Sequence, residues 1–459
     1  MRIEHDSLGE VAIPRWAYWG AQTQRAVENF PVSGLALPEE LITSLALIKQ
    51  QAAEVNRELG GLEPATAEAI SRAAGEVIAG KWRGHFPVDV FQTGSGTSTN
   101  MNVNEVIANR ANELLGAPLG ARHPVHPNDH VNRGQSSNDV FPSAIHMAAR
   151  QAAARLGRSL AELEEALDRK SVEFAAIVKL GRTHLQDAVP MTLGQEFSGY
   201  AEQIRIGRAH VESCLFHLEE LALGGTAVGT GLNADPRFAE RVIARIAAAT
   251  DIPFRRAHNR FAALAGREAL VALMGAAETV AVSLMKIADD LRLLSSGPRA
   301  GLGEIALPAL QPGSSIMPGK VNPVIPEMVM QVAAHVMGNR LAVSVGGQHG
   351  PLELNMMMPL SAYHTLQALG LLSAAASLLA GKCVAGITAD SARCAAMVEQ
   401  SLALATPLAL RVGYDRAAEV VRRARESGRT IREQAISDGV LTEAEADAVL
   451  DPRKMAEPS

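Results

Sequence analysis

Five long stretches with a helical pattern constrain this chain more than any other feature of its sequence. Arg267–Ser296 holds 30 residues without a proline, and as one helix it would be about 45 Å long. The other four stretches run over about Asp139–Lys170, Thr192–Leu223, Glu327–Val345 and Leu354–Ile387. Helices of this length bury their apolar faces only by lying side by side, so the sequence predicts an elongated up-and-down bundle.

Length and composition indicate how many domains accompany this bundle. A chain of 459 residues is too long for one compact core. Its hydrophobic content of 47% comes mostly from Ala, Leu and Val, and such small residues let helices approach closely. We predict a mainly all-α protein with three domains: a mixed, mostly helical N-terminal domain at 1–135, the central long-helix bundle at 136–390 and a small helical domain at 391–459.

Charge and cysteine usage exclude several classes of protein. A net charge of −6 and a pI of about 6.1 do not fit a nucleic-acid binder. Three scattered cysteines argue against a disulfide framework and for a reducing compartment. The N-terminal residues lack a signal-peptide pattern. We therefore expect a cytoplasmic protein.

One stretch raises the question of a membrane span. Leu354–Gly381 contains no Asp, Glu, Lys or Arg and is long enough to cross a bilayer. It also contains eight polar or aromatic-polar residues, among them Asn355, His364 and Gln367. We interpret it as a bundle helix that is apolar on most faces, and we expect no membrane association.

Four polar loops interrupt the apolar helices. They are Gln92–Asn102, His123–Asp139, Gly181–Asp187 and Gln311–Glu327. The first, second and fourth place hydroxyls, glycines or amides directly before a helix, where free N–H groups attract anions. For any one loop, helix capping alone is a sufficient explanation. Three such loops together with Lys320 favour a small ligand with more than one carboxylate.

The third loop contributes a histidine. His184 could move protons near neutral pH, although a loop histidine is more often an ordinary surface residue.

Two further patterns lead to no site. His123, His126, Asp129 and His130 lack a defined metal-binding spacing, so we expect no metal. The glycine-rich run GGTAVGTGLN lacks the Lys-Ser/Thr of a phosphate-binding loop and is interpreted as a turn between helices.

Taken together, these segments resemble one known superfamily. GSSIMPGKVNP, at the start of the fourth loop, resembles the signature loop of the fumarase/aspartase superfamily. Six further motifs match the family in the family's order: WGAQTQRAVENF, TGSGTSTNMNVNEVIANR, HPNDHVNRGQSSNDVFP, GRTHLQDAVPMTLGQ, GGTAVGTGLN and GYDRAAE. Ser95 and Ser137 follow the class II fumarases, since aspartases tend to have alanine and threonine at these positions.

The resemblance implies a fold, an assembly and an activity. It implies a three-domain fumarase/aspartase-like fold whose central five-helix bundles join into a twenty-helix core in a homotetramer. Each active site would be built from three chains. The implied reaction is the reversible hydration of fumarate to L-malate, with no cofactor.

The same resemblance assigns roles to individual residues. Ser314 would be the base that removes the C3 proton, and Lys320 would stabilise the resulting charge. His184, oriented by Glu327, would protonate the leaving hydroxyl. The implied substrate contacts are Ser95, Gly96, Thr97, Ser136, Ser137, Asn138, Thr183, Ser315, Lys320, Val321 and Asn322. His126, Pro127, Asn128 and Asp129 match a second dicarboxylate site of the family.

Two other functions remain open on sequence grounds. One is a C–N lyase of the same superfamily, such as aspartate ammonia-lyase, which release of ammonia from L-aspartate would reveal. The other is a catalytically silent structural protein on the lyase fold, like the lens crystallins derived from this superfamily. Retention of Ser314, His184, Lys320 and Glu327 argues against the silent protein, because a structural role requires none of them.

Overall fold

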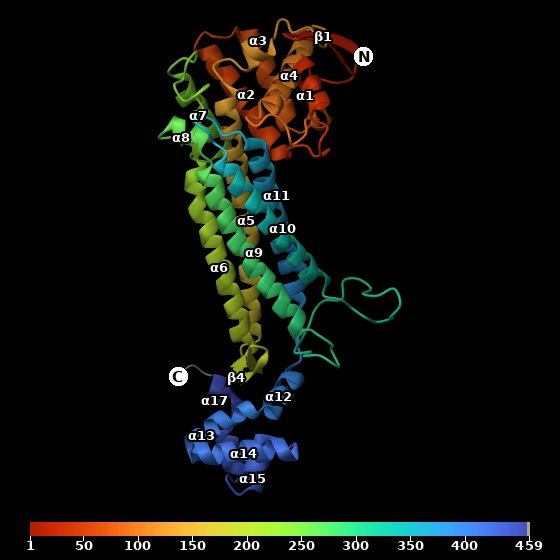
Figure 1. The fold of residues 1–459 in the computed structure, drawn as a ribbon, viewed down its shortest axis with the longest axis vertical. Coiled ribbons are helices and arrows are strands. Elements are labelled where there is room, and N and C mark those ends of the chain that lie inside the picture. Colours follow the sequence, from red (N-terminus) through yellow and green to blue (C-terminus); the bar gives the residue numbers. More distant parts are fainter. Residues whose placement is uncertain (457–459) are drawn as a thin grey trace. The chain divides into compact units, whose positions relative to one another are not determined.

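The computed structural model describes residues 1–456 and is predominantly helical, which confirms the predicted fold class (Figure 1). The chain divides into two compact units. Unit 1 comprises Met1–Gly157, Ala209–Thr279 and Ala334–Leu372, and unit 2 comprises Arg158–Arg208, Val280–Ala333 and the described residues from Ser373 on. The predicted domain boundaries at 135 and 390 stay a prediction, because the two units divide the long helices rather than separating them from their neighbours.

The five predicted long helices are all present. They are α5 (Ser137–Glu173), α6 (Leu193–Leu218), α9 (Glu268–Leu294), α10 (Val324–Gln348) and α11 (Met358–Leu378). Side-chain bonds join α5 to α6, α6 to α9, α9 to α10 and α10 to α11. The sequence-based interpretation of helices lying side by side is therefore confirmed.

The predicted helix ends differ from the observed ones where local chemistry intervenes. The last long helix was expected to run from Leu354 to Ile387, but α11 begins only at Met358, with Pro359 in its first turn. Beyond Leu378 the backbone changes to a π-turn over Leu379–Cys383 and a 3₁₀ turn over Val384–Gly386. Helix α10 begins at Val324, since Pro326 is tolerated in a first turn, where its missing N–H costs nothing.

Two helical stretches meet the length and composition of a membrane span. They are α9 and Met358–Gly386, each with a mean hydropathy of 1.7. In both, half of the most apolar window is buried inside the protein. The core helices of soluble proteins have the same properties, so this finding is weak support for a span, and the absence of membrane association stays a prediction.

Unit 1 contains the smaller N-terminal elements. Its elements besides the long helices are β1 (Arg2–Asp6), β2 (Gly9–Ile13), α1 (Ala21–Asn29), α2 (Glu39–Glu58), α3 (Pro64–Ile78), η1 (Arg83–His85), α4 (Thr97–Leu114), η2 (Pro127–Val131), β5 (Glu220–Leu221), α7 (Phe238–Thr250), β6 (Arg255–Arg256) and α8 (Arg260–Ala265). Strands β1 and β2 pair antiparallel, with Arg2 opposite Ile13. The short strands β5 and β6 pair in parallel.

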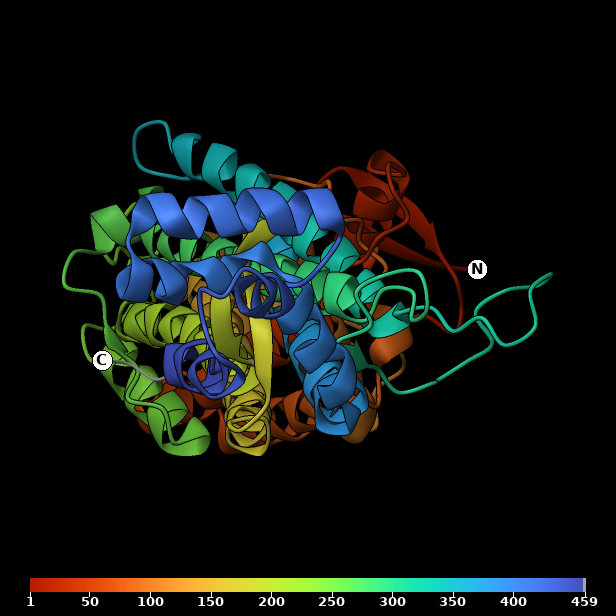
Figure 2. The same cartoon turned by 90° about the horizontal axis from the view of Figure 1, so that it is seen from below.

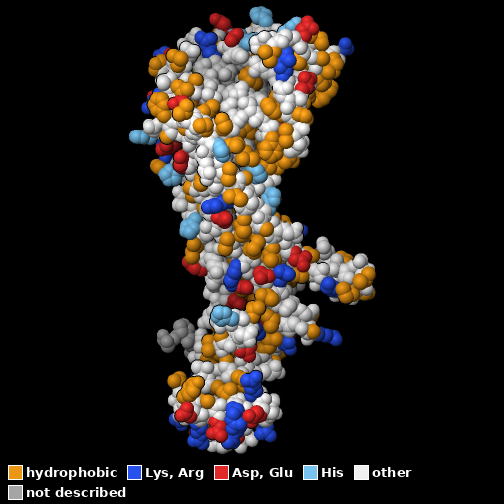
Figure 3. All heavy atoms as spheres, in the orientation of Figure 1, with side chains coloured by type: hydrophobic (Ala, Val, Ile, Leu, Met, Phe, Trp, Pro, Cys, Tyr) orange, Lys and Arg blue, Asp and Glu red, His pale blue; other side chains and the backbone are white. Residues whose placement is uncertain are grey.

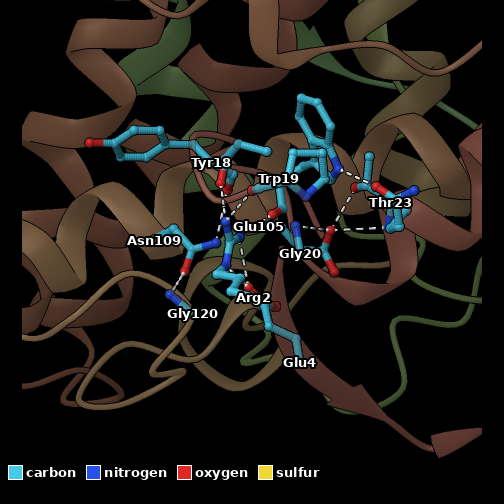
Figure 4. Close-up of polar contacts among 12 residues, drawn as sticks. Arg2, Glu4, Tyr18, Trp19, Gly20, Thr23, Glu105, Asn109 and Gly120 are labelled. Atoms are coloured by element: carbon cyan, nitrogen blue, oxygen red, sulfur yellow. Dashed lines mark hydrogen bonds and ion pairs between the residues drawn. The ribbon is translucent and has the colours of Figure 1, made fainter. Parts of the chain in front are cut away.

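A buried carboxylate joins the N-terminal segment to α4 (Figure 4). Glu105, in the middle of α4, accepts hydrogen bonds from the backbone N–H groups of Gly20, Gln22 and Thr23 and from the Thr23 hydroxyl. These groups lie at the start of α1, whose free N–H groups favour a negative charge. Burial nevertheless raises the pKa of Glu105. The bonds hold α4 in place, and the N-terminus of α4 carries the first polar loop.

Unit 2 contains the C-terminal elements and two small sheets. Its elements besides the long helices are β3 (Val178–Thr183), β4 (Gln186–Thr192), β7 (Ile305–Ala306), the turns η3 and η4 described above, β8 (Thr388–Ala389), α12 (Ser391–Gln400), η5 (Leu402–Leu404), α13 (Ala405–Val412), α14 (Tyr414–Ser427), α15 (Ile431–Ser437), α16 (Glu443–Val449) and α17 (Pro452–Ala456). Leu180 of β3 is buried in the same apolar cluster as residues of the C-terminal helices. This cluster gives the β3–β4 hairpin a fixed base.

Candidate active site

The candidate residues fall into two groups, one in each unit. The residues of the first two polar loops lie in unit 1, and those of the hairpin and the fourth loop lie in unit 2. We name Ser95, Thr97, Ser136, Ser137 and Asn138 the serine platform, and Gln311–Pro323 the signature loop.

The first part of the serine platform precedes α4. Gly96 adopts the left-handed conformation with φ of 74° as the N-cap of this helix, and a Cβ there would lie 2.5 Å from the Phe141 ring. Only glycine fits this position without strain. The Ser95 and Thr97 hydroxyls lie 2.8 Å apart, next to the free N–H groups of the α4 N-terminus. The arrangement is suited to an anion.

The second part of the serine platform begins α5. The Asn100 amide donates a hydrogen bond of 3.1 Å to Ser137 Oγ, so the Ser137 proton is free to be donated to another acceptor. The Asn138 amide donates to the Ala227 carbonyl. That carbonyl belongs to the glycine-rich run Gly224–Asn233, which the structure confirms as an irregular turn after β5.

Beneath the platform lie two buried charged residues that the sequence analysis missed. Lys49 of α2 is fully buried and donates to Asn132 Oδ1 and Gln135 Oε1 at 2.8 and 2.9 Å. Asp139 of α5 is also fully buried, and burial raises its pKa to about 6. A signal was present, because Lys49 occupies the apolar face of a helical pattern, four residues after Leu45.

The segment matched to a second dicarboxylate site forms one turn of π-helix, η2. His126 caps this turn, with Nδ1 accepting from the backbone N–H groups of Asn128 and Asp129, and Pro127 is its first residue. Arg122 Nη2 lies 2.7 Å from His126 Nε2. Burial and this guanidinium lower the pKa of His126. Within residues 1–456, no group of three or more His, Cys, Asp or Glu side chains could hold a metal ion.

His184 lies in a tight turn rather than the open loop that the sequence suggested. Thr183 pairs with Gln186 across the β3–β4 hairpin, so His184 and Leu185 alone form the connection. Both have positive φ, at 55° and 59°. Two-residue hairpins of this kind match the twist of the strands, and side chains other than Gly, Asn or Asp are uncommon in them. The turn exposes the His184 side chain to solvent.

The signature loop is held mainly by bonds within itself. The Gly313 N–H donates to the Lys320 carbonyl at 2.8 Å, and the Asn322 amide donates to the Gly313 carbonyl at 2.6 Å. A Cβ on Gly313 would lie 2.4 Å from the Lys320 carbonyl oxygen, so the closure requires glycine. Lys320 and Ser315 are exposed, as is Val321. The loop extends away from the helices α9 and α10 that flank it (Figures 1 and 2).

Ser314 has an unusual environment within this loop. Its Oγ accepts hydrogen bonds from the backbone N–H groups of Ile316 and Met317, at 3.2 and 3.0 Å. Two N–H donors on one hydroxyl oxygen lower the free energy of its deprotonated form, as an oxyanion hole does. The sequence predicted a base at this position only by resemblance, and that role stays a prediction.

One pairing implied by the resemblance is not formed within the chain. His184 in the hairpin turn and Glu327 in the first turn of α10 both lie in unit 2. Among the described residues, no hydrogen bond or ion pair joins them. Their partnership therefore stays a prediction.

Comparisons with known proteins agree with the residue patterns. A family model described as "Lyase" matches residues 9–338, and one described as "Fumarase C C-terminus" matches residues 404–457. A class II fumarate hydratase of Nitrosomonas europaea is 53% identical over 457 residues, which are 99% of each chain. The human mitochondrial fumarate hydratase is 51% identical over 460 residues, covering 100% of this chain and 90% of its own. The crystal structure of a class II fumarase from Schistosoma mansoni matches with a TM-score of 0.95 and 42% identity, covering 100% of this chain and 99% of that one.

Proposed function

The chain belongs to the class II fumarate hydratase family of lyases, and from this membership and the site geometry we propose which residues carry out its reaction. The reaction is the reversible addition of water to fumarate, which gives L-malate, a step of the tricarboxylic acid cycle. The observation that carries the assignment of residues is the pair of backbone N–H groups on Ser314 Oγ.

Ser314 is the base of the dehydration direction. As an alkoxide it takes a proton from C3 of malate, and the electron pair left on carbon spreads into the adjacent carboxylate. The N–H groups of Ile316 and Met317 stabilise the alkoxide before the transfer. In the hydration direction the same hydroxyl returns the proton to C3.

The intermediate formed by this transfer is an aci-carboxylate, a carboxylate that carries the extra negative charge of the carbanion. Lys320 supplies the cation for it, and Asn322 supplies an amide donor once the amide exchanges its bond to the Gly313 carbonyl for one to the substrate. The remaining substrate contacts come from the serine platform, with Gly96, Thr183, Ser315 and Val321. The free proton of Ser137 is suited to a substrate carboxylate.

His184 is the acid of the dehydration direction. It protonates the hydroxyl that leaves C2, through a bound water, and Glu327 orients the imidazole and stabilises its charged form. In the proposed tetramer this pair forms between different copies of the chain, as the resemblance implies. The active site then combines residues of three chains.

We propose a homotetramer with a twenty-helix core as the active form. Eight large apolar side chains are exposed on the long helices, and Figure 3 shows hydrophobic side chains on their surface. They are Val172 on α5, Ile206 and Phe216 on α6, Val282 and Leu293 on α9, Leu341 and Val345 on α10 and Leu378 on α11. Apolar surface of this kind is costly in a monomer and is removed from water by association.

The enzyme requires no metal and no organic cofactor in this proposal. Ser314 and His184 transfer the protons and Lys320 supplies the positive charge, so the reaction needs no metal or cofactor.

The partner molecules of the enzyme are fumarate and L-malate, and it acts in the cytoplasm. The cysteines Cys214, Cys383 and Cys394 are free and buried, which is compatible with a reducing compartment.

A direct assay tests the proposal. The purified protein should consume fumarate, measured by its ultraviolet absorbance, after treatment with a chelator. L-Aspartate serves as the comparison substrate, and no ammonia should be released from it. Activity on L-aspartate alone would identify an ammonia-lyase instead, and activity on neither would leave a silent structural protein. Activity that is lost on chelation and restored by a divalent cation would contradict metal independence.

A further inference from the structure

We propose that Lys49 is a positioning residue of the dicarboxylate site: its buried charge lies beneath the serine platform, fixes Ser137 as a hydrogen-bond donor and attracts a substrate carboxylate. The inference rests on the proposed function, because it assigns Lys49 a role toward the same dicarboxylate.

The position of the charge is unusual. Lys49 is 0% exposed, and within residues 1–456 no carboxylate forms an ion pair with it. Its Nζ instead donates to two neutral amide oxygens, on Asn132 and Gln135. A buried cation without a paired anion is costly for stability, and such groups gather at functional sites.

Asp139 does not supply the missing anion. One of its oxygens accepts the Ser136 N–H, and the other accepts the N–H groups of Gly224 and Thr226. The carboxylate is thus occupied in holding the start of α5 to the glycine-rich turn. The negative charge of Asp139 raises the pKa of Lys49 electrostatically, without a hydrogen bond between the two side chains. Burial has the larger effect and lowers the pKa of Lys49 to about 7.

A chain of hydrogen bonds leads from Lys49 to Ser137. Asn132 Oδ1 accepts from Lys49 at 2.8 Å, from Asn104 at 3.1 Å and from Asn100 at 3.3 Å. Asn100 uses the same amide nitrogen to donate to Ser137 Oγ. The charge-assisted bond from Lys49 fixes Asn132, and Asn132 fixes the Asn100 amide. The amide occupies one lone pair of Ser137 Oγ, which directs the Ser137 proton toward another acceptor, such as a ligand carboxylate.

A dicarboxylate at the platform would complete this arrangement. Its carboxylate would accept the Ser137 proton, and it would bring a negative charge close to Lys49. In a poorly solvated interior this attraction is stronger than the same pair would have in water. Lys49 therefore contributes to substrate affinity without touching the substrate.

A purely structural role is the alternative. Lys49 also ties α2 to the segment that follows η2, through Asn132 and Gln135. If these hydrogen bonds were only structural, their loss would lower the melting temperature and leave the affinity of the folded protein for a dicarboxylate unchanged. Affinity measured on the folded protein therefore separates the two roles.

The experiment compares three variants of the full-length protein. Lys49→Met removes the charge at similar volume, Lys49→Arg restores a cation, and Lys170→Met is the matched control. Lys170 is a buried lysine of unit 2 whose bonds go to Glu173 and the Ile387 carbonyl, neither of which is a candidate residue. Calorimetry gives the Kd of succinate, a non-reactive dicarboxylate, and kinetics with fumarate gives kcat and KM.

Lys49→Met should raise the succinate Kd and the fumarate KM by about tenfold or more, with a smaller change in kcat. Lys49→Arg should recover most of the affinity, and Lys170→Met should lower the melting temperature without changing Kd. If Lys49→Met does not fold, Lys49→Gln replaces it, since its amide can donate to one of the same oxygens without a charge, and the same rise in Kd is expected.

A folded Lys49→Met or Lys49→Gln protein that binds succinate within twofold of the wild type overturns the inference. In that case the wild type still hydrates fumarate, so the proposed function stands. A wild type that neither binds succinate nor hydrates fumarate overturns both.

Discussion

The serine platform and the signature loop contain the same kinds of residue but are held in different ways. Ser137 of the platform is fixed by Asn100, which is fully buried and is itself bonded to Asn132. Ser314 of the loop accepts its hydrogen bonds from the next turn of its own exposed segment. Ser137 is therefore held by buried side chains around it, whereas the loop keeps its shape through a few local bonds.

The difference separates binding from chemistry. Folding orders the platform before substrate arrives, so a dicarboxylate binds without further loss of conformational freedom there. The signature loop has few buried contacts, and in the proposed mechanism it closes to bring Ser314 and Lys320 to the substrate, as mobile catalytic loops do. Changes in the loop should therefore affect turnover, and changes in the platform should affect affinity.

The largest expected effect comes from the loop serine. Ser314→Ala removes the base, so kcat should fall by at least the roughly 10²–10⁴-fold that positioned proton transfer contributes. Succinate binding, measured by calorimetry, should stay close to that of the wild type because Lys320 and the platform remain. Near-normal turnover would show that Ser314 is not the base and that the loop serves only binding or closure.

Lys320 tests whether the loop contributes to binding as well. Lys320→Ala removes a cation that attracts the substrate and stabilises the aci-carboxylate, so both affinity and kcat should fall. We expect a loss in kcat of about 10²–10³-fold, comparable with removal of an oxyanion-hole donor. Steady-state kinetics and succinate calorimetry measure the two parts. A change in kcat alone would assign all carboxylate binding to the platform.

His184 tests the hairpin turn. His184→Asn should preserve the turn, because asparagine tolerates positive φ, while removing the acid. A fall in kcat of about 10²-fold is expected, with unchanged secondary structure by circular dichroism. Recovery of the lost rate by added imidazole would support proton transfer as its role, whereas unchanged kcat would exclude it.

Ser137 is the matching test on the platform. Ser137→Ala removes a donor to the substrate carboxylate, so KM and the succinate Kd should rise about tenfold, in keeping with a hydrogen bond to a charged group. The change in kcat should be much smaller than for Ser314→Ala. If kcat collapses while affinity persists, the division of roles between platform and loop is wrong.

The smallest effect concerns the stability of the platform. Burial raises the pKa of Asp139 to about 6, above its unfolded value of 3.8. Between these values the folded state binds more protons, so this group's contribution to stability is lost as the pH rises through 6. The stability advantage of the wild type over Asp139→Asn should grow by about 2 kcal/mol from pH 7 to pH 4. Thermal unfolding at several pH values measures it, and a constant difference would contradict the shifted pKa.

The sequence predicted the helices well because their length and apolar pattern leave few arrangements. It also located the polar loops that precede α4, α5 and α10, since hydroxyls, glycines and prolines stand out against alanine-rich helices. The third predicted loop, Gly181–Asp187, is instead mostly β-strand. It did not predict that His184 would occupy a two-residue turn, because no Gly or Asn marks that position. Lys49 was missed since one lysine in an apolar pattern is easily read as a solvated side chain. The bonds on Ser314 depend on a local fold of the loop that residue types alone do not specify.

The distribution of the candidate residues over separate segments has a genetic consequence. If three chains build each site, a chain that lacks Ser314 and a chain that lacks Ser137 carry defects in different parts of a shared site. Mixed tetramers of the two would contain some sites in which every segment is intact. Two alleles that are each inactive could then restore growth together, while two different lesions in the signature loop could not. Heterozygous phenotypes would follow the position of each lesion rather than its severity.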